Sequence, residues 1–134
     1  MLRFDGIYCS PLIKDEALSY RDYFRFYEDG SVLAVVSTGT ATEVARWFHK
    51  DTSQLSEGRY TLDGLSISFS TASPGGEIDR NEEFYDGSLQ VIVSYNGQVG
   101  DNVLHLHSHS HFNGHEATIA CEFVPIELLP PRSQ

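Results

Sequence analysis

Four pairs of aspartate or asparagine followed by glycine constrain the fold of this chain more than any other feature. They lie between stretches in which apolar and polar residues alternate, at Asp29-Gly30, Asp63-Gly64, Asp86-Gly87 and Asn113-Gly114. Such a pair between alternating stretches indicates a β-hairpin, because glycine accepts the positive φ that tight hairpin turns require. Four hairpin turns along 134 residues predict an antiparallel meander.

A two-residue loop decides which side chains face each other, so each turn can be tested for consistent faces. Around Asp63-Gly64 it pairs Leu62 with Leu65 and Tyr60 with Ile67, which makes one face apolar. Around Asp86-Gly87 it pairs Phe84 with Leu89, and Val91 continues that face. The loop at Asp29-Gly30 fits two or three residues, so two registers stay open, with Phe24 and Phe26 facing either Val35 and Leu33 or Ala34 and Val32.

The turn at Asn113-Gly114 separates a histidine-rich stretch from the last predicted strand. A two-residue loop there gives one apolar face with the pairs Leu104–Phe123, Leu106–Cys121, Ser108–Ile119 and Ser110–Ala117. The other face carries the pairs His105–Glu122, His107–Ala120, His109–Thr118 and His111–Glu116. Both strands therefore agree on which side is buried.

One segment departs from the strand pattern. Residues 42–48 place Val44, Trp47 and Phe48 at positions i, i+3 and i+4 after a threonine suited to capping a helix, which predicts one short amphipathic helix near 42–50. Two interpretations are open for it. Trp47 and Phe48 close one end of the sheet, or they form a lid over a cavity.

The alternating stretches predict about nine strands. They lie near 4–9, 20–28, 31–38, 57–62, 65–71, 81–87, 88–95, 102–110 and 115–124. Strands joined mainly by hairpins, each with one apolar face, avoid exposed edges by closing into a barrel. The fold class expected is therefore all-β, an antiparallel up-and-down barrel of about eight to ten strands, favoured over a β-sandwich. It forms one domain over 1–126, with a C-terminal tail at 127–134.

Charge and cysteine content limit the classes of partner. Nine Lys and Arg against nineteen Asp and Glu give a formal charge of −10, which disfavours nucleic acid and anionic membranes. No long apolar run and no signal peptide are present, so a cytoplasmic location is expected. The two cysteines, Cys9 and Cys121, are expected to be free thiols, although a bridge stays open if the first and last strands are neighbours.

A series of residues resembles the C-terminal β-domain of the F-box-only proteins that also carry tetratricopeptide repeats, and more loosely the lipocalin-type barrels. The matching segments are 4–8, 23–26, 29–32, 58–62, 102–104, 109–110 and 122–123. This resemblance implies a lipocalin-like (calycin-type) β-barrel, and the lipocalin analogy implies an apolar pocket for a small molecule. It implies no catalytic residues, and no adaptor role in ubiquitin ligation, because the chain has no F-box and no helical repeats.

The function expected first is non-catalytic binding of a small apolar ligand inside the barrel. The predicted ligand-binding residues are Tyr8, Phe24, Phe26, Trp47, Tyr60, Phe69, Leu106 and Phe123. The alternative is a filled barrel that acts as a protein-interaction or dimerisation module, so that the protein is a monomer or a homodimer. In that case the outward residues Tyr23, Arg25 and Tyr27 are one candidate surface, because Tyr and Arg are enriched at interface centres.

The histidine-rich strand suggests a third function. Alternation puts His105, His107, His109 and His111 on one face, with successive residues about 6.7 Å apart along the strand, so neighbouring imidazoles could converge on Zn²⁺ or another transition metal. Facing His105 and His111 with Glu122 and Glu116 would also favour imidazolium, as in a pH sensor. An ordinary solvated strand face is the competing interpretation.

Sequence motifs for catalysis are absent. The chain has no Gly-x-Ser-x-Gly elbow, phosphate-binding glycine loop, Cys-x-x-Cys pair or His-Glu-x-x-His helix. We therefore expect no enzyme activity and no cofactor, apart from the transition metal considered above.

Overall fold

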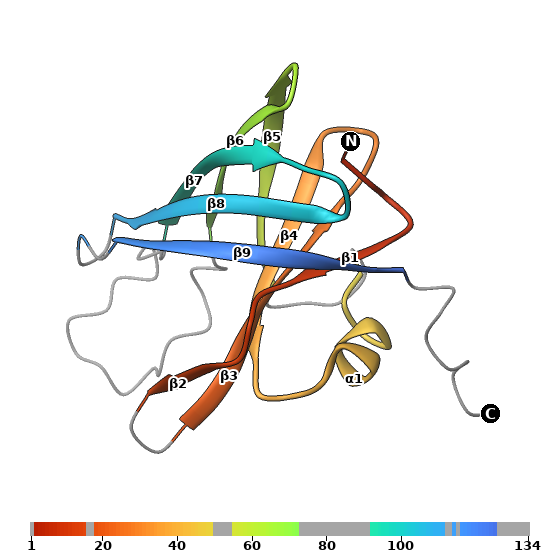
Figure 1. The fold of residues 1–134 in the computed structure, drawn as a ribbon, viewed down its shortest axis with the longest axis vertical. Coiled ribbons are helices and arrows are strands. Elements are labelled where there is room, and N and C mark those ends of the chain that lie inside the picture. Colours follow the sequence, from red (N-terminus) through yellow and green to blue (C-terminus); the bar gives the residue numbers. More distant parts are fainter. Residues whose placement is uncertain are drawn as a thin grey trace, which may run out of the picture.

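The computed structural model describes residues 2–15, 18–49, 55–72, 92–111, 114 and 116–125 (Figure 1). These residues form nine strands and one short helix. In chain order they are β1 (Gly6–Cys9), β2 (Ile13–Asp15), β3 (Leu18–Phe26), β4 (Ser31–Ser37), α1 (Ala41–Ala45), β5 (Ser56–Asp63), β6 (Ser66–Ala72), β7 (Ile92–Val99), β8 (Val103–Ser110) and β9 (Glu116–Pro125).

Eight of these strands close into an antiparallel barrel, which confirms the predicted fold class. The hydrogen-bonded order runs β1-β9-β8-β7-β6-β5-β4-β3, and β3 pairs with β1 to complete the ring. The short β2 pairs only with β3 and was not predicted. The predicted strand at 81–87, the Asp86-Gly87 turn and the tail at 127–134 lie outside the described residues. Among those described, β6 pairs directly with β7.

The predicted faces of the hairpin strands are correct, but two predicted registers are wrong by two residues. Leu62 lies opposite Ile67 rather than Leu65, because the turn is made by Gly64 and Leu65. In the same way, Leu104 lies opposite Cys121 rather than Phe123. Side chains alternate with a period of two, so a slip of two residues leaves every side chain on its expected face.

The turn between β3 and β4 decides the register that the sequence left open. Phe24 lies opposite Ala34 and Phe26 opposite Val32. The Tyr27 amide donates to the Ser31 carbonyl and the Gly30 amide to the Tyr27 carbonyl. Gly30 adopts a φ of 96°, a conformation that glycine accepts without strain. The loop therefore has three residues.

Two strand glycines allow the barrel wall to bend sharply. A Cβ atom on Gly58 would collide with the Ser70 carbonyl oxygen on β6, and one on Gly97 with the His105 carbonyl oxygen on β8. Glycine in a strand interior marks such close backbone approaches at barrel corners. Both positions face the interior, where the curved strands crowd each other.

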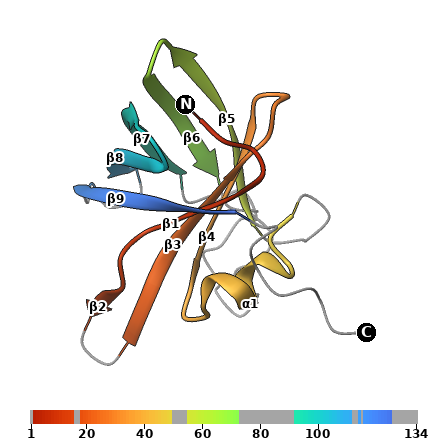
Figure 2. The same ribbon diagram turned by 45° about the vertical axis from the view of Figure 1, so that its right-hand side comes forward.

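A second apolar cluster lies on the outer side of the wall. Val44 and Phe48, both fully buried, pack there against Ile7, Tyr23 and Leu33, with Trp47 partly buried beside them. Figure 2 shows α1 beside β4 and outside the ring of strands. Phe48 is buried as predicted, but it and Trp47 cover the outer wall, so the prediction that they close one end of the sheet is wrong.

Local hydrogen bonds hold the helical segment in this place. Thr40 and Glu43 form a capping box at the start of α1, in which the Glu43 amide donates to the Thr40 hydroxyl and the Thr40 amide donates to the Glu43 carboxylate. After the helix, an Arg25 guanidinium nitrogen donates to the Phe48 carbonyl at 2.9 Å. The capping box fixes the start of the helix, and the Arg25 bond ties the end of the segment to β3.

This outer cluster also changes the interpretation of the predicted Tyr-Arg-Tyr docking surface. Tyr23 is completely buried beneath the helical segment, and its hydroxyl donates to the Gly39 carbonyl at 2.6 Å. The Arg25 guanidinium lies 5.2 Å from the centre of the Tyr27 ring. A partner could not reach Tyr23 without displacing α1, so these three residues do not form an open surface.

Candidate functional site

The predicted ligand-binding residues gather inside the barrel, with the exception of Trp47. Six of them are buried in a single interior cluster, namely Tyr8, Phe24, Phe26, Phe69, Leu106 and Phe123, and Tyr60 packs against that cluster. Their rings interlock at close range. Phe26 makes edge contacts with Tyr8 at 5.7 Å, Tyr60 at 5.3 Å and Phe69 at 5.4 Å between ring centres. Over the described residues, these side chains pack closely against one another inside the barrel.

The two tyrosine hydroxyls of this set already have partners. The Tyr8 hydroxyl accepts from the Arg3 amide at 3.0 Å, and the Tyr60 hydroxyl donates to the Tyr27 carbonyl at 2.7 Å. Buried hydroxyls without such bonds would destabilise the fold. These hydroxyls therefore serve the packed core, and their existing hydrogen bonds leave them poorly placed to orient a ligand.

The interior does have a mouth that is apolar and accessible, beside the turn between β5 and β6. A hollow of about 280 Å³ lies there, which we call the apolar mouth; it is lined by Leu2, Phe4, Leu62, Gly64, Leu65 and Val99. Leu62 and Leu65 are 44% and 57% exposed. Leu2 and Val99 belong to the interior cluster, so the hollow continues the core outward. The sequence predicted Leu62 and Leu65 as a cross-strand pair, and only the corrected register leaves Leu65 at the exposed turn.

Sequence reasoning missed one polar group on the interior face, Asp22. It lies opposite Val36 and two residues before Phe24, so alternation turns its side chain to the inside. Burial raises the pKa of its carboxyl above the ordinary value of 3.8. Burial also raises the pKa of Tyr95 to about 12, and the charge of Asp22 adds to this rise. The sequence could have revealed this, because Asp22, Phe24 and Phe26 are alternate residues of one strand and therefore share its inward face.

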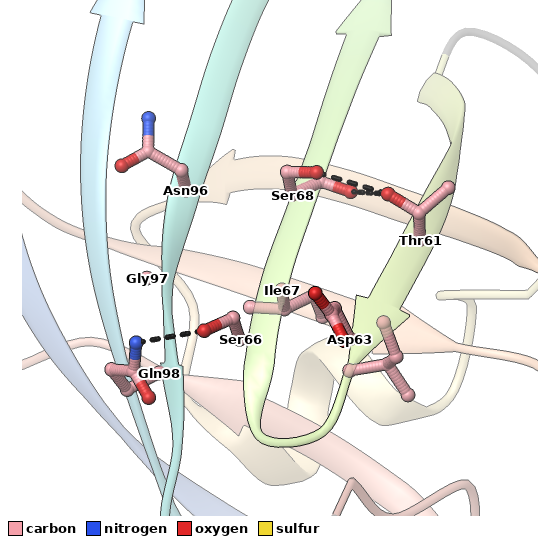
Figure 3. Close-up of a pocket in the computed structure, with 9 residues that line it drawn as sticks. Thr61, Asp63, Ser66, Ile67, Ser68, Asn96, Gly97 and Gln98 are labelled. Carbon is pink, nitrogen blue, oxygen red and sulfur yellow. Dashed lines mark hydrogen bonds between the residues drawn. The ribbon is translucent and has the colours of Figure 1, made fainter.

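The outer face of β5, β6 and β7 carries mainly polar side chains, among them the charged Arg59 and Asp63. The Thr61 and Ser68 hydroxyls are 3.0 Å apart, and the Gln98 amide donates to the Ser66 hydroxyl at 3.1 Å (Figure 3). Two adjoining hollows of about 330 and 430 Å³ lie over these strands. This face therefore offers hydrogen-bonding groups rather than apolar area.

Along the edge of that face, a serine and a histidine come together. Ser94 of β7 faces outward, and its hydroxyl oxygen lies 2.7 Å from Nε2 of His111, the residue that follows β8. The Ser70 hydroxyl of β6 lies 2.9 Å from the Ser94 hydroxyl. Three segments thus contribute to one hydrogen-bonded row.

The other predicted metal ligands do not converge as expected. His105 lies opposite Ala120 rather than Glu122, so the predicted pair of His105 with Glu122 is wrong. The predicted pair of His111 with Glu116 is wrong for the same reason, a register shifted by two residues. Instead, Glu116 lies opposite His109 and accepts a hydrogen bond from Nε2 of His107 at 2.8 Å. Nδ1 of His109 is 3.7 Å from the same carboxylate. The hydrogen bond from His107 lowers the pKa of Glu116. Because the Glu116 carboxylate is exposed, solvent screens this interaction and keeps its effect on stability small.

Among the described residues, no group of three or more His, Cys, Asp and Glu side chains is arranged to hold a metal ion. The zinc interpretation of His105, His107, His109 and His111 therefore gains no support from the geometry. The hydrogen bonds of His107 and His111 instead go to Glu116 and Ser94.

Comparisons with known proteins assign no family to this chain. In the described part of the chain, no helix has the length and apolar character needed to cross a bilayer. No protein-family model matches the chain, and neither a curated protein nor a solved structure is significantly similar to it. The barrel is consistent with a lipocalin-like fold, and no match supports the more specific resemblance to the F-box-only proteins.

Proposed function

We propose that the protein binds a small, uncharged apolar molecule at the apolar mouth of its barrel. The observation that carries this proposal is the hollow of about 280 Å³ over Leu62 and Leu65. These two apolar side chains stay exposed although they lie next to the buried core. Apolar concave sites at barrel mouths are typical positions for small ligands. We assign the ligand to the mouth rather than to the interior, because Phe24, Phe26 and Leu106 pack together in the buried core cluster.

The volume of the hollow and the net charge of the protein limit which ligands can bind there. A hollow of this volume lies just below the range of about 300 to 1,000 Å³ for ligand pockets, which suits a small ligand such as a fused ring or a short alkyl chain. The formal charge of −10 repels anions, so a neutral ligand is favoured over a fatty-acid carboxylate. Binding would come from apolar area removed from water, at about 25 cal/mol per Å².

A titration with the neutral dye N-phenyl-1-naphthylamine tests this proposal. We expect saturable fluorescence enhancement, together with NMR shifts of the backbone amides of Gly64, Leu65 and Val99. Leu65→Asp should weaken binding at least tenfold, because it puts a charge into the hollow. Leu12→Asp is the matched control, since Leu12 is 44% exposed but lies between β1 and β2 and should bind the dye normally.

Two results would contradict the proposal. The first is the absence of saturable binding by the unaltered protein. The second is equal affinity in the Leu65→Asp and Leu12→Asp variants, which would place the dye elsewhere. Shifts concentrated at Phe24 and Leu106 would show that the interior opens to admit a ligand, and would overturn the assignment to the mouth.

A further inference from the structure

The row formed by Ser70, Ser94 and His111 has the geometry of an activated nucleophile. With the His111 proton on Nδ1, the Ser94 hydroxyl donates to Nε2 across 2.7 Å. The Ser70 hydroxyl, 2.9 Å away, can then donate to the Ser94 oxygen. A serine hydroxyl becomes nucleophilic when a general base lies within about 2.6 to 3.2 Å of it, as the imidazole does here.

The backbone of His111 is tied to β7, and its ring contacts the ring of His109. The His111 amide donates to the Ile92 carbonyl at 2.8 Å, which ties the residue to the first residue of β7. The ring edge of His109 packs against the His111 ring, with ring centres 5.5 Å apart and planes at 80°. Nδ1 of His109 in turn faces the Glu116 carboxylate at 3.7 Å. Nucleophilic sites typically have a base that is oriented by a third group.

Ser94 also borders a space in which a substrate could lie. The hollow of about 430 Å³ is lined by Ser70, Ser94 and Asn96 together with side chains of β5 and β6. Asn96 follows Ser94 on the same face of β7, and Figure 3 shows its carboxamide projecting from the sheet. Carboxamide N–H groups are among the donors that stabilise the oxyanion formed during acyl transfer.

We propose that Ser94 is a reactive serine that accepts an acyl group from an ester of a small carboxylic acid, with His111 as the general base. The Ser94 oxygen forms a bond to the acyl carbon while its proton passes to Nε2 of His111. The bond between the acyl carbon and the ester oxygen breaks, and His111 returns the proton to the departing alcohol. No oxidant, reductant or metal is needed. This activity goes beyond ligand binding at the apolar mouth and does not depend on it.

Incubation with p-nitrophenyl acetate, followed by peptide mass spectrometry, tests the proposal. We expect one acetyl group on Ser94, formed faster than on any other serine. His111→Gln should slow this acetylation at least 100-fold, because general-base catalysis contributes about 10²- to 10⁴-fold.

Ser94→Ala and Ser66→Ala form a matched pair of control variants. Ser66 lies on the same face but bonds to the Gln98 amide rather than to an imidazole, so Ser66→Ala should leave the acetylation of Ser94 unchanged. Ser94→Ala should abolish acetylation of the 92–99 peptide and lower the release of p-nitrophenol. Circular dichroism checks that each variant folds. Ser66 and His111 are exposed, so their substitution should leave the barrel intact.

Either of two outcomes would overturn the proposal. One is acetylation of Ser94 at the same rate with and without the His111 imidazole. The other is unchanged p-nitrophenol release in Ser94→Ala, which would show that free imidazoles alone react with the ester.

Discussion

Cys9 and Cys121 lie on neighbouring strands, yet their side chains are on opposite faces of the barrel wall. In the β1–β9 ladder, Cys9 lies opposite Glu122, the residue after Cys121. Cys9 packs with the outer cluster under α1, and Cys121 is fully buried in the interior cluster. Barrel closure therefore makes β1 and β9 neighbours, as a disulfide between Cys9 and Cys121 would require. The alternation of side chains along each strand nevertheless keeps the two thiols on opposite faces. Both cysteines are free, as predicted.

The two thiols should differ in reactivity. Burial raises the pKa of Cys121 to about 12, so almost no thiolate is available there at neutral pH. Cys9 is only partly buried, although burial raises the pKa of its thiol too. Iodoacetamide at pH 8 should therefore alkylate Cys9 first, and Cys121 only on unfolding. Mass spectrometry of the native protein and of Cys9→Ser checks this order, and equal rates at both sites would contradict it.

Asp22→Asn should stabilise the protein at neutral pH. Burial raises the pKa of the Asp22 carboxyl in the folded state, so the folded protein holds this proton more tightly than the unfolded chain. Stability is then lost as the pH rises from about 3.8 through the folded-state pKa. Urea unfolding should show Asp22→Asn gaining stability over the unaltered protein at pH 7, with the gain disappearing at pH 3. The control is Asp63→Asn, at the exposed last residue of β5, which should show no such gain.

Glu116→Gln should have the opposite pH dependence. The hydrogen bond from His107 lowers the folded-state pKa of Glu116, so its contribution to stability is present above about 4.5 and is lost as the pH falls through the lower, folded-state value. The melting temperature of Glu116→Gln should be slightly below that of the unaltered protein at pH 6 and equal to it at pH 2. Glu122→Gln, on the same face of β9 but opposite Val103, is the control. A larger effect of Glu122→Gln at pH 6 would contradict the assignment.

Phe26→Ala should be among the most damaging substitutions. The Phe26 ring is fully buried and makes edge contacts with Tyr8, Tyr60 and Phe69. Removing a buried phenylalanine ring costs about 3 to 5 kcal/mol, because the cavity left behind collapses only in part. Val36→Ala, at a site that is mostly exposed, should cost about 0.5 kcal/mol or less. Urea unfolding measures both, and similar losses would mean that the barrel is not packed around Phe26.

The sequence allowed the faces of the strands to be predicted better than their registers. Leu104 and Leu106 point inward and His105 and His107 outward, as alternation predicted. The predicted partners were wrong because an Asx-Gly pair marks a turn without stating how many residues the loop contains. A slip of two residues changes each partner and leaves each face intact, so burial alone could not reveal the error.

The candidate sites depended more on tertiary structure. Of the residues predicted to bind a ligand, Trp47 packs on the outer wall of the barrel, and the others pack on each other inside it. The apolar mouth joins Leu2 and Phe4 to Leu65, and no local pattern shows that the first residues of the chain lie beside that turn.

The order of apolar and polar residues by itself determined that this chain folds into antiparallel strands with one buried face, because side chains in a strand must alternate. Only the closed barrel decided which distant residues meet. Ser94 faces His111, and α1 covers Tyr23, because the stagger between neighbouring strands and the lengths of their loops set these contacts. Strand stagger and loop lengths act together across the whole sheet, so no single segment determines which distant residues meet.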